Sequence, residues 1–448
     1  MDISLKFFFT KVFGLDELVL FSVLAKISQA FGMIILLLSV SLFLDDTQRG
    51  FYFSFTSIAS LQVFFELGIG VVITQHAARY IVDCGGSLDF NNHSNPAAFK
   101  KIRGLFQFNL IWTTLAGLFL FVMMMPSGII FFNSVQESES VSWFFEWFIL
   151  CIAIAIFLPM SSQLSFFEGA GYLREVLKLR LFLALSSYVV AILVLFFGFA
   201  LYAVSFIFLT QVAIIAIWIA TKKKTILKLM FVELPKYSSF LYWFKHLLPM
   251  QSRIAIAFIF GNLSIQVSTP VTLSYFGATA AGEIGLLITI TNMFVGFMGA
   301  WMATKIPIFS KLIEDGNILS LNTLFYSTVK KSSLVFIILS MAMYSFSLIY
   351  FHFVETQFTS STTVLSFLFL AALVSISYAQ AVYLRSFLKE LFVLSSFANA
   401  AFFFLLFPIL LPKLGINGLV TCLLAAMFIS TSITTLIFIN FKRKYISP

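Results

Sequence analysis

Long apolar segments follow one another through almost the whole chain and leave little room for a soluble domain. About twelve such segments run from Leu18 to Phe441, and each has the roughly 20 residues that a helix needs to cross the hydrocarbon core of a bilayer. Hydrophobic residues make up 60% of the 448 residues and charged residues 10%, against about 45–50% and about 25% in soluble domains. The sequence therefore predicts an all-α integral membrane protein. The predicted spans are residues 18–44, 51–75, 104–125, 143–167, 181–199, 202–221, 254–276, 284–304, 332–354, 364–384, 391–411 and 418–441.

The basic residues give the orientation of these spans. With twelve spans, 25 of the 28 Lys and Arg residues fall on the side that carries both termini, and only Arg49 and Lys413 fall on the other. Cytoplasmic loops of membrane proteins are enriched in Lys and Arg, so both termini are predicted to be cytoplasmic. This placement also accounts for the net charge of +9 without a nucleic-acid partner.

A basic linker divides the spans into two equal sets. Residues 222–253 contain seven Lys and Arg residues, with six predicted spans before them and six after. The sequence thus predicts an N-terminal lobe (1–221), a cytoplasmic linker (222–253) and a C-terminal lobe (254–448), which form two six-helix lobes around a central cavity. Four aromatic residues suggest that part of the linker lies on the membrane surface: Phe240, Tyr242, Trp243 and Phe244.

A short internal repeat supports the division into two halves. The segment YLREVLK begins at Tyr172, near the end of the fourth span, and YLRSFLK begins at Tyr383, at the end of the tenth. Five of the seven positions are identical, at the same topological place in each half. Six spans return the chain to its starting side, so the halves would be parallel repeats.

Two charged residues lie well inside predicted spans. Lys26 and Glu66 are at similar heights, roughly 12–14 Å from the cytoplasmic ends of two consecutive spans. Two interpretations remain open: the residues form a buried pair, or Lys26 faces the central cavity and binds an anion. In the second case Lys26 and Arg253, at the cytoplasmic mouths of the two lobes, would hold a diphosphate. Glu66 is a separate candidate for coupling to H⁺ or Na⁺.

Uncharged polar residues recur within the spans. They would line a hydrated path and bind sugar hydroxyls, or they would form hydrogen bonds between helices. The residues predicted to line the sugar path are Gln29, Gln62, Asn262, Gln266 and Asn292.

The sequence carries no sign of an enzyme. It lacks the GxSxG, HExxH, Walker and CxxC patterns, and its three cysteines are far apart, without metal-ligand spacing. Transport would therefore use an ion or substrate gradient, and no cofactor or metal is expected.

Several stretches together resemble the bacterial Wzx-type flippases of O-antigen and related oligosaccharide repeats. These stretches are residues 50–75, 248–262, 269–292, 301–313 and 383–390. The resemblance implies the fold of the multidrug/oligosaccharidyl-lipid/polysaccharide exporter superfamily. It also implies transfer of an undecaprenyl-diphosphate-linked oligosaccharide across the bacterial inner membrane by alternating access. Besides this substrate and bilayer lipid, a polysaccharide polymerase and a chain-length regulator would be candidate partners.

Three alternatives remain open from the sequence. The first is a multidrug or small-molecule exporter of the same fold. The second is a membrane-embedded polysaccharide polymerase or glycosyltransferase, against which the short outer loops argue. The third is a structural partner of a polysaccharide assembly complex.

Overall fold

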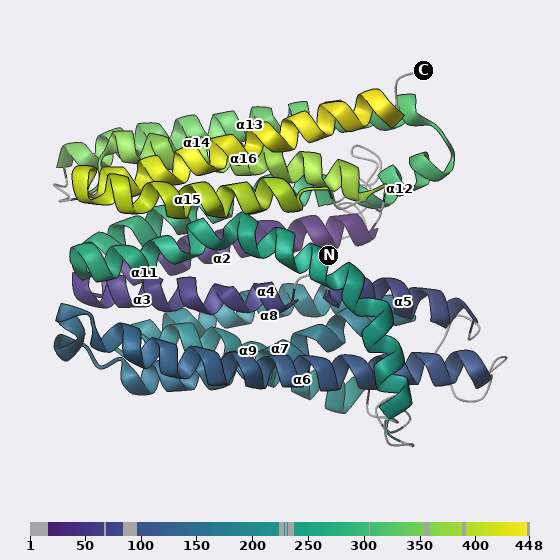
Figure 1. The fold of residues 1–448 in the computed structure, drawn as a ribbon. Coiled ribbons are helices and arrows are strands. Elements are labelled where there is room, and N and C mark those ends of the chain that lie inside the picture. Colours follow the sequence, from purple (N-terminus) through teal and green to yellow (C-terminus); the bar gives the residue numbers. More distant parts are fainter. Residues whose placement is uncertain are drawn as a thin grey trace, which may run out of the picture. The chain divides into compact units, whose positions relative to one another are not determined.

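Helices account for all the regular structure that the computed structural model describes (Figure 1). It describes residues 17–66, 69–83, 96–223, 237–303, 305–353, 358–387 and 391–445, together with Lys228 and Phe231. The all-α prediction is confirmed. Most of each predicted span is helical in this part of the chain, although several helices extend well beyond the span.

The helices of the first half follow one another in the order of the predicted spans. They are α2 (Glu17–Phe43), α3 (Asp46–Ala59), α4 (Val63–Glu66), α5 (Ile69–Asp83), α6 (Pro96–Asn133), α7 (Phe144–Phe167), α8 (Leu173–Phe196) and α9 (Tyr202–Lys222). The second span is not one regular α-helix, because a 3₁₀ turn, η1 (Ser60–Gln62), separates α3 from α4. A π-turn, η4 (Glu168–Tyr172), joins α7 to α8.

The second half begins with the longest helix. Its elements are α11 (Tyr237–Ala303), α12 (Ile306–Glu314), α13 (Ile318–Phe353), α14 (Ser361–Arg385), α15 (Val393–Leu414) and α16 (Ile416–Tyr445). Both α6 and α13 are longer than their predicted spans, and α13 starts at Ile318 rather than at residue 332. Hydropathy marks only the apolar part of a helix, whereas the backbone hydrogen bonds continue into its polar ends.

Eight helical segments of the described residues are long and apolar enough to cross a membrane. Two of them, Phe144–Phe196 with 53 residues and Ala255–Gly299 with 45, are long enough for two crossings each. A glycine with a positive φ angle divides each one: Gly171 (φ 95°) in η4 and Gly277 (φ 81°) in α11. L-amino acids with a side chain rarely adopt such angles, so glycine is needed where these helices bend.

The chain forms two compact units. The N-terminal unit comprises the described residues of Met1–Gln48 and Ala59–Ala255, and the C-terminal unit those of Arg49–Ile58 and Ile256–Pro448. The predicted lobes of residues 1–221 and 254–448 stay a prediction.

In the N-terminal unit, α7 is the central helix. It packs against α5, α6 and α9, while α8 packs against α2 and α9. Phenylalanines fill the space between α6 and α7: the ring of Phe106 lies 5.0 Å from that of Phe166 and 6.4 Å from that of Phe167, centroid to centroid. All three are fully buried.

In the C-terminal unit, α16 packs against both α14 and α15. Polar side chains tie its helices together. The Nδ2 atom of Asn399 on α15 donates to the carbonyl of Gly261 on α11 at 2.8 Å and to Ser264 Oγ at 3.1 Å. Gln380 on α14 donates to Thr435 on α16 at 3.0 Å. These two residues therefore act as hydrogen-bond links between helices.

Part of α3 also belongs to the C-terminal unit. Gly50 lies against the backbone of Ala278, and Gly285 lies against the side chain of Phe53. A Cβ atom at either glycine would overlap its neighbour. Small residues thus allow the backbones of α3 and α11 to approach closely, as is typical of helix contacts in membranes.

Each of the repeated tyrosines has a lysine near its ring. The Lys223 ammonium, just after α9, lies 3.3 Å from the centroid of the Tyr172 ring. The Lys442 ammonium, near the end of α16, lies 6.0 Å from the centroid of the Tyr383 ring. In each unit, the tyrosine of the repeat thus faces a lysine at the end of the last predicted span of that half. One difference is that Lys223 also pairs with Glu175 at 3.0 Å, whereas the matching repeat position holds Ser386.

The aromatic residues of the predicted linker pack into the N-terminal unit. Trp243 is 2% exposed, and its ring lies 5.8 Å from that of His76 and 5.7 Å from that of Tyr80 on α5. Trp243 is therefore buried against α5, and the membrane-surface position of part of the linker stays a prediction. Tyr242, 42% exposed, remains at the surface.

Candidate functional site

The predicted site residues fall into both units. Glu66 on α4 and Gln62 in η1 belong to the N-terminal unit, as does Gln29 on α2, whereas Asn262, Gln266 and Asn292 on α11 belong to the C-terminal unit. Lys26 and Arg253 lie on α2 and α11, but their side chains are outside the described residues. The diphosphate site, the Lys26–Glu66 pair and the sugar path stay predictions.

In the N-terminal unit, the carboxylate of Glu66 is held by a side chain of another helix. The Ser161 hydroxyl on α7 donates to Glu66 Oε1 at 2.6 Å. Ser161 lies in the turn after Pro159, a proline inside α7. A hydrogen bond of this length is typical of a hydroxyl bound to a carboxylate. It fixes the position of one oxygen of the Glu66 carboxylate.

The same segment of α7 forms hydrogen bonds with two neighbouring helices. Ser162 Oγ donates to Asn109 Oδ1 on α6 at 2.7 Å, and Asn109 Nδ2 donates to the Ser162 carbonyl at 3.2 Å. Thr74 on α5 donates to the carbonyl of Ser165 at 2.9 Å. These bonds hold α7 in one rotational position and so fix the direction of Ser161.

Two glutamines add unsatisfied polar atoms to these helices. Gln62, 6% exposed, lies four residues before Glu66, and its Oε1 has no partner among the described residues. Gln163 on α7 is 3% exposed, and neither its Oε1 nor its Nε2 has a hydrogen-bond partner among the described residues. An unsatisfied buried polar group costs about 1–3 kcal/mol. Such groups are suited to bind water or a polar ligand.

The three predicted residues on α11 show no comparable arrangement. Asn262 Nδ2 donates to the carbonyl of Phe258 in its own helix at 3.0 Å. Gln266 is half-buried, and Asn292 is exposed. Within the described residues, no group of three or more His, Cys, Asp or Glu side chains could hold a metal ion.

Sequence reasoning found Glu66 but missed the residues that hold it. Ser161 and Ser162 follow Pro159 after one intervening methionine and precede Gln163, so four of five consecutive residues there are polar or proline. A polar run next to a proline in the middle of an apolar span was the available signal, because proline frees a backbone group that polar side chains can satisfy.

No protein-family model and no curated protein matches this sequence, but solved structures match nearly its whole length. An outward-facing multidrug resistance MATE family transporter of the MOP superfamily has a TM-score of 0.59 at 13% identity, with 96% of this chain and 98% of that chain covered. A mutant of the Vibrio cholerae MATE transporter VcmN has a TM-score of 0.60 at 13% identity, with 96% of each chain covered. The eukaryotic MATE transporter AtDTX14 has a TM-score of 0.56 at 15% identity, with 94% of each chain covered.

The chain has the MATE transporter fold. The three solved structures named above are described as transporters. Together with the apolar helices, the likeness supports a multi-pass membrane protein.

Proposed function

We propose that this protein is an alternating-access exporter of small organic molecules, coupled to the entry of H⁺ or Na⁺. The MATE fold supports the transport class. The observation that carries the coupling is the Glu66 carboxylate, held by Ser161 at 2.6 Å between α4 and α7.

Glu66 would couple ion binding to a change of conformation. While its carboxylate is charged, it accepts a hydrogen bond from the Ser161 hydroxyl and attracts a monovalent cation. Once protonated, the carboxyl group becomes a hydrogen-bond donor, and the Ser161 hydroxyl can rotate to accept. An ion that binds one conformation of a transporter more tightly shifts the equilibrium toward that conformation. The contact between α4 and α7 is the one that would change.

The test is ion-driven transport of ethidium into proteoliposomes containing DNA, followed by fluorescence under an imposed proton or sodium gradient. We expect Glu66→Gln to lose at least roughly tenfold in gradient-driven rate, because the amide neither ionises nor releases a proton. Glu283→Gln is the matched control, since the Thr359 hydroxyl donates to Glu283 Oε2 at the same 2.6 Å in the C-terminal unit. Full gradient-driven transport by Glu66→Gln would contradict the coupling role.

A second candidate is a flippase for undecaprenyl-diphosphate-linked oligosaccharide in the bacterial inner membrane. The observations that favour it are the resemblance of residues 50–75, 248–262 and 269–292 to that family, and a cation, Lys26, inside the first predicted span. A lysine within a span suits an anionic headgroup better than an organic cation. A polysaccharide polymerase and a chain-length regulator would then be partners.

The two candidates differ in what they move. Vesicles holding the purified protein and an undecaprenyl-diphosphate oligosaccharide with a fluorescent sugar would report flipping as quenching by an impermeant reductant. Protein-dependent flipping that Lys26→Ala abolishes and Lys26→Arg retains would favour the flippase. Transport of ethidium without flipping would favour the exporter.

A further inference from the structure

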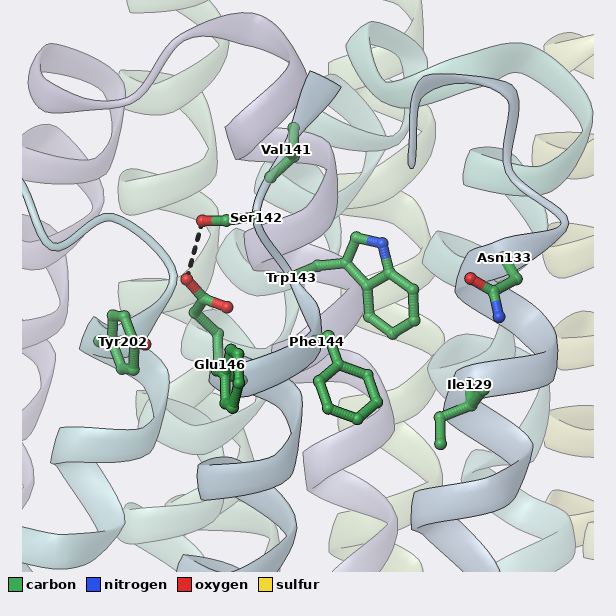
Figure 2. Close-up of a pocket in the computed structure, with 9 residues that line it drawn as sticks. Ile129, Asn133, Val141, Ser142, Trp143, Phe144, Glu146 and Tyr202 are labelled. Atoms are coloured by element: carbon green, nitrogen blue, oxygen red, sulfur yellow. Dashed lines mark hydrogen bonds between the residues drawn. The ribbon is translucent and has the colours of Figure 1, made fainter. Parts of the chain in front are cut away.

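A pocket of about 600 Å³ lies at one end of the N-terminal unit (Figure 2). The residues that line it are far from Glu66 in the sequence. The end of α6, the start of α7 and the start of α9 form it. The charge distribution predicts that these helix ends are extracytoplasmic. The volume is typical of pockets for small molecules. Residues that line it are Ile129, Asn133, Val141, Ser142, Trp143, Phe144, Phe145, Glu146 and Tyr202.

Its one acidic residue is a nearly buried carboxylate. Glu146 is 6% exposed. The Ser142 hydroxyl donates to Glu146 Oε1 at 2.9 Å, and no Lys, Arg or His among the described residues forms an ion pair with this carboxylate. Its position in the first turn of α7 provides about half a positive charge from the helix dipole. The remaining negative charge is left for a ligand to neutralise.

Aromatic side chains are the most numerous kind in the wall of this pocket. Phe144 and Phe145 are 45% and 67% exposed, and their rings meet at 85° with centroids 5.5 Å apart. The Trp143 ring stands at 67° to that of Phe144, 6.0 Å away. Figure 2 shows Glu146 drawn between Tyr202 on α9 and the rings of Trp143 and Phe144. Several aromatic rings with different orientations therefore line the pocket close to the carboxylate.

We propose that this pocket binds an ammonium group. A positive charge would neutralise Glu146 and interact with the negative faces of the aromatic rings, the combination by which proteins recognise quaternary ammonium ligands. An anionic ligand would instead be repelled by Glu146. This site lies within the N-terminal unit and does not depend on the proposed export function.

An ammonium group has two sources at this face of the membrane. One is a free organic cation, and the other is the ethanolamine headgroup of a phospholipid. Either source would place an ammonium group against the Glu146 carboxylate. One measurement is therefore needed for the affinity for a free cation, and another for competition by the lipid headgroup.

The first measurement is equilibrium binding of radiolabelled tetramethylammonium to the purified full-length protein in a neutral detergent. Saturable binding is expected, and Glu146→Gln should weaken it roughly tenfold or more, since charge-assisted contacts are the stronger ones. Phe145→Leu, at a mostly exposed position, should also weaken it. The matched control is Glu139→Gln, which changes an exposed carboxylate in the segment between α6 and α7. This substitution should leave the affinity for tetramethylammonium unchanged.

A second measurement locates the bound cation. With Cys84 replaced by Ser, Asn133→Cys places a thiol in the pocket, while Cys151 and Cys422 are buried. Tetramethylammonium should protect this thiol from an impermeant maleimide, and Glu146→Gln should remove the protection. A thiol at exposed Ser140, outside the pocket lining, should react equally with and without the cation.

Unchanged tetramethylammonium affinity in Glu146→Gln, or no protection of Asn133→Cys, would overturn the proposal. Nanodiscs of phosphatidylglycerol, with and without phosphatidylethanolamine, identify the source. Competition by phosphatidylethanolamine would assign the site to the lipid headgroup, and unchanged binding would assign it to free cations.

Discussion

Buried polar residues in these helices are used in two different ways. Asn399 is 1% exposed, and its amide nitrogen donates two short hydrogen bonds to α11, so it stabilises helix packing. Gln163 is similarly buried, yet its Oε1 and Nε2 have no partner among the described residues. Residue type alone does not separate the two cases. The difference depends on which helix each side chain faces.

His76 makes the stability of the N-terminal unit sensitive to pH. It lies just beyond the predicted second span, and burial beside Trp243 lowers its pKa below the ordinary value of 6.5, with further lowering from the positive charges of Arg79 and His246. The folded protein therefore takes up a proton at His76 less readily than the unfolded chain. Stability is fully present above pH 6.5 and is lost as the pH falls from there toward the lowered pKa.

The measurement is the melting temperature of the purified protein in detergent between pH 7.5 and 5.5. We expect His76→Phe to lose less stability than the wild type over this range, because phenylalanine keeps the aromatic contact with Trp243 but binds no proton. His352→Phe is the control, because it removes a histidine at the end of α13, in the C-terminal unit. An identical pH dependence in His76→Phe and the wild type would rule out this role.

Single residues were only partly predictable from the sequence. Glu66 stood out because a carboxylate within an apolar span is rare. Its partner Ser161 did not, because serine is common in such spans and the contact joins residues 95 positions apart. Glu146 was also missed, since it lies three residues inside a predicted span, where its neighbours look like ordinary interfacial aromatics.

At the scale of the helix, the bend at Gly277 divides the apolar segment Ala255–Gly299 of α11 into two lengths that each suit a bilayer. Its φ of 81° and ψ of 179° are open to glycine and costly for other residues. Gly277→Ala is expected to destabilise the protein by about 1–3 kcal/mol, seen as a lower melting temperature. Gly296→Ala is the matched control in the same helix, because no atom lies within 4 Å of its added Cβ. Equal melting temperatures for the two variants would show that the bend tolerates a side chain.

The sequence predicted which segments form helices but not where those helices begin and end. The apolar composition of each span was sufficient to predict a helix there. The 3₁₀ turn at Ser60–Gln62 interrupts the second predicted span, whose hydropathy continues unchanged, and the π-turn at Glu168–Tyr172 lies just after the end of the fourth. Only glycine marks the second of these, and many of the 22 glycines lie in unbroken helices.

At the scale of the whole molecule, the membership of the C-terminal unit predicts how the chain tolerates being divided. Residues Arg49–Ile58 belong to this unit together with Ile256–Pro448. A fragment of residues 231–448 therefore lacks a segment against which α11 packs. We expect it to be degraded when expressed alone and to be protected when coexpressed with residues 1–230.

The control for the split-chain experiment is a first fragment that carries Gly50→Leu. Its larger side chain would collide with the backbone of Ala278, so coexpression should protect the second fragment less well. Stable, monodisperse expression of residues 231–448 alone would contradict the prediction.

The contact between Gly50 and Ala278 also has a consequence for biosynthesis. The two residues are about 230 positions apart, and at a synthesis rate of roughly 5–20 residues per second the second leaves the ribosome about 10–50 s after the first. Throughout this interval the outer part of α3 is already made and its partner surface does not yet exist. The nascent chain thus passes through a stage at which Gly50 and Phe53 are open to lipid, to a membrane chaperone or to a neighbouring copy, and it is here that assembly is most exposed to error.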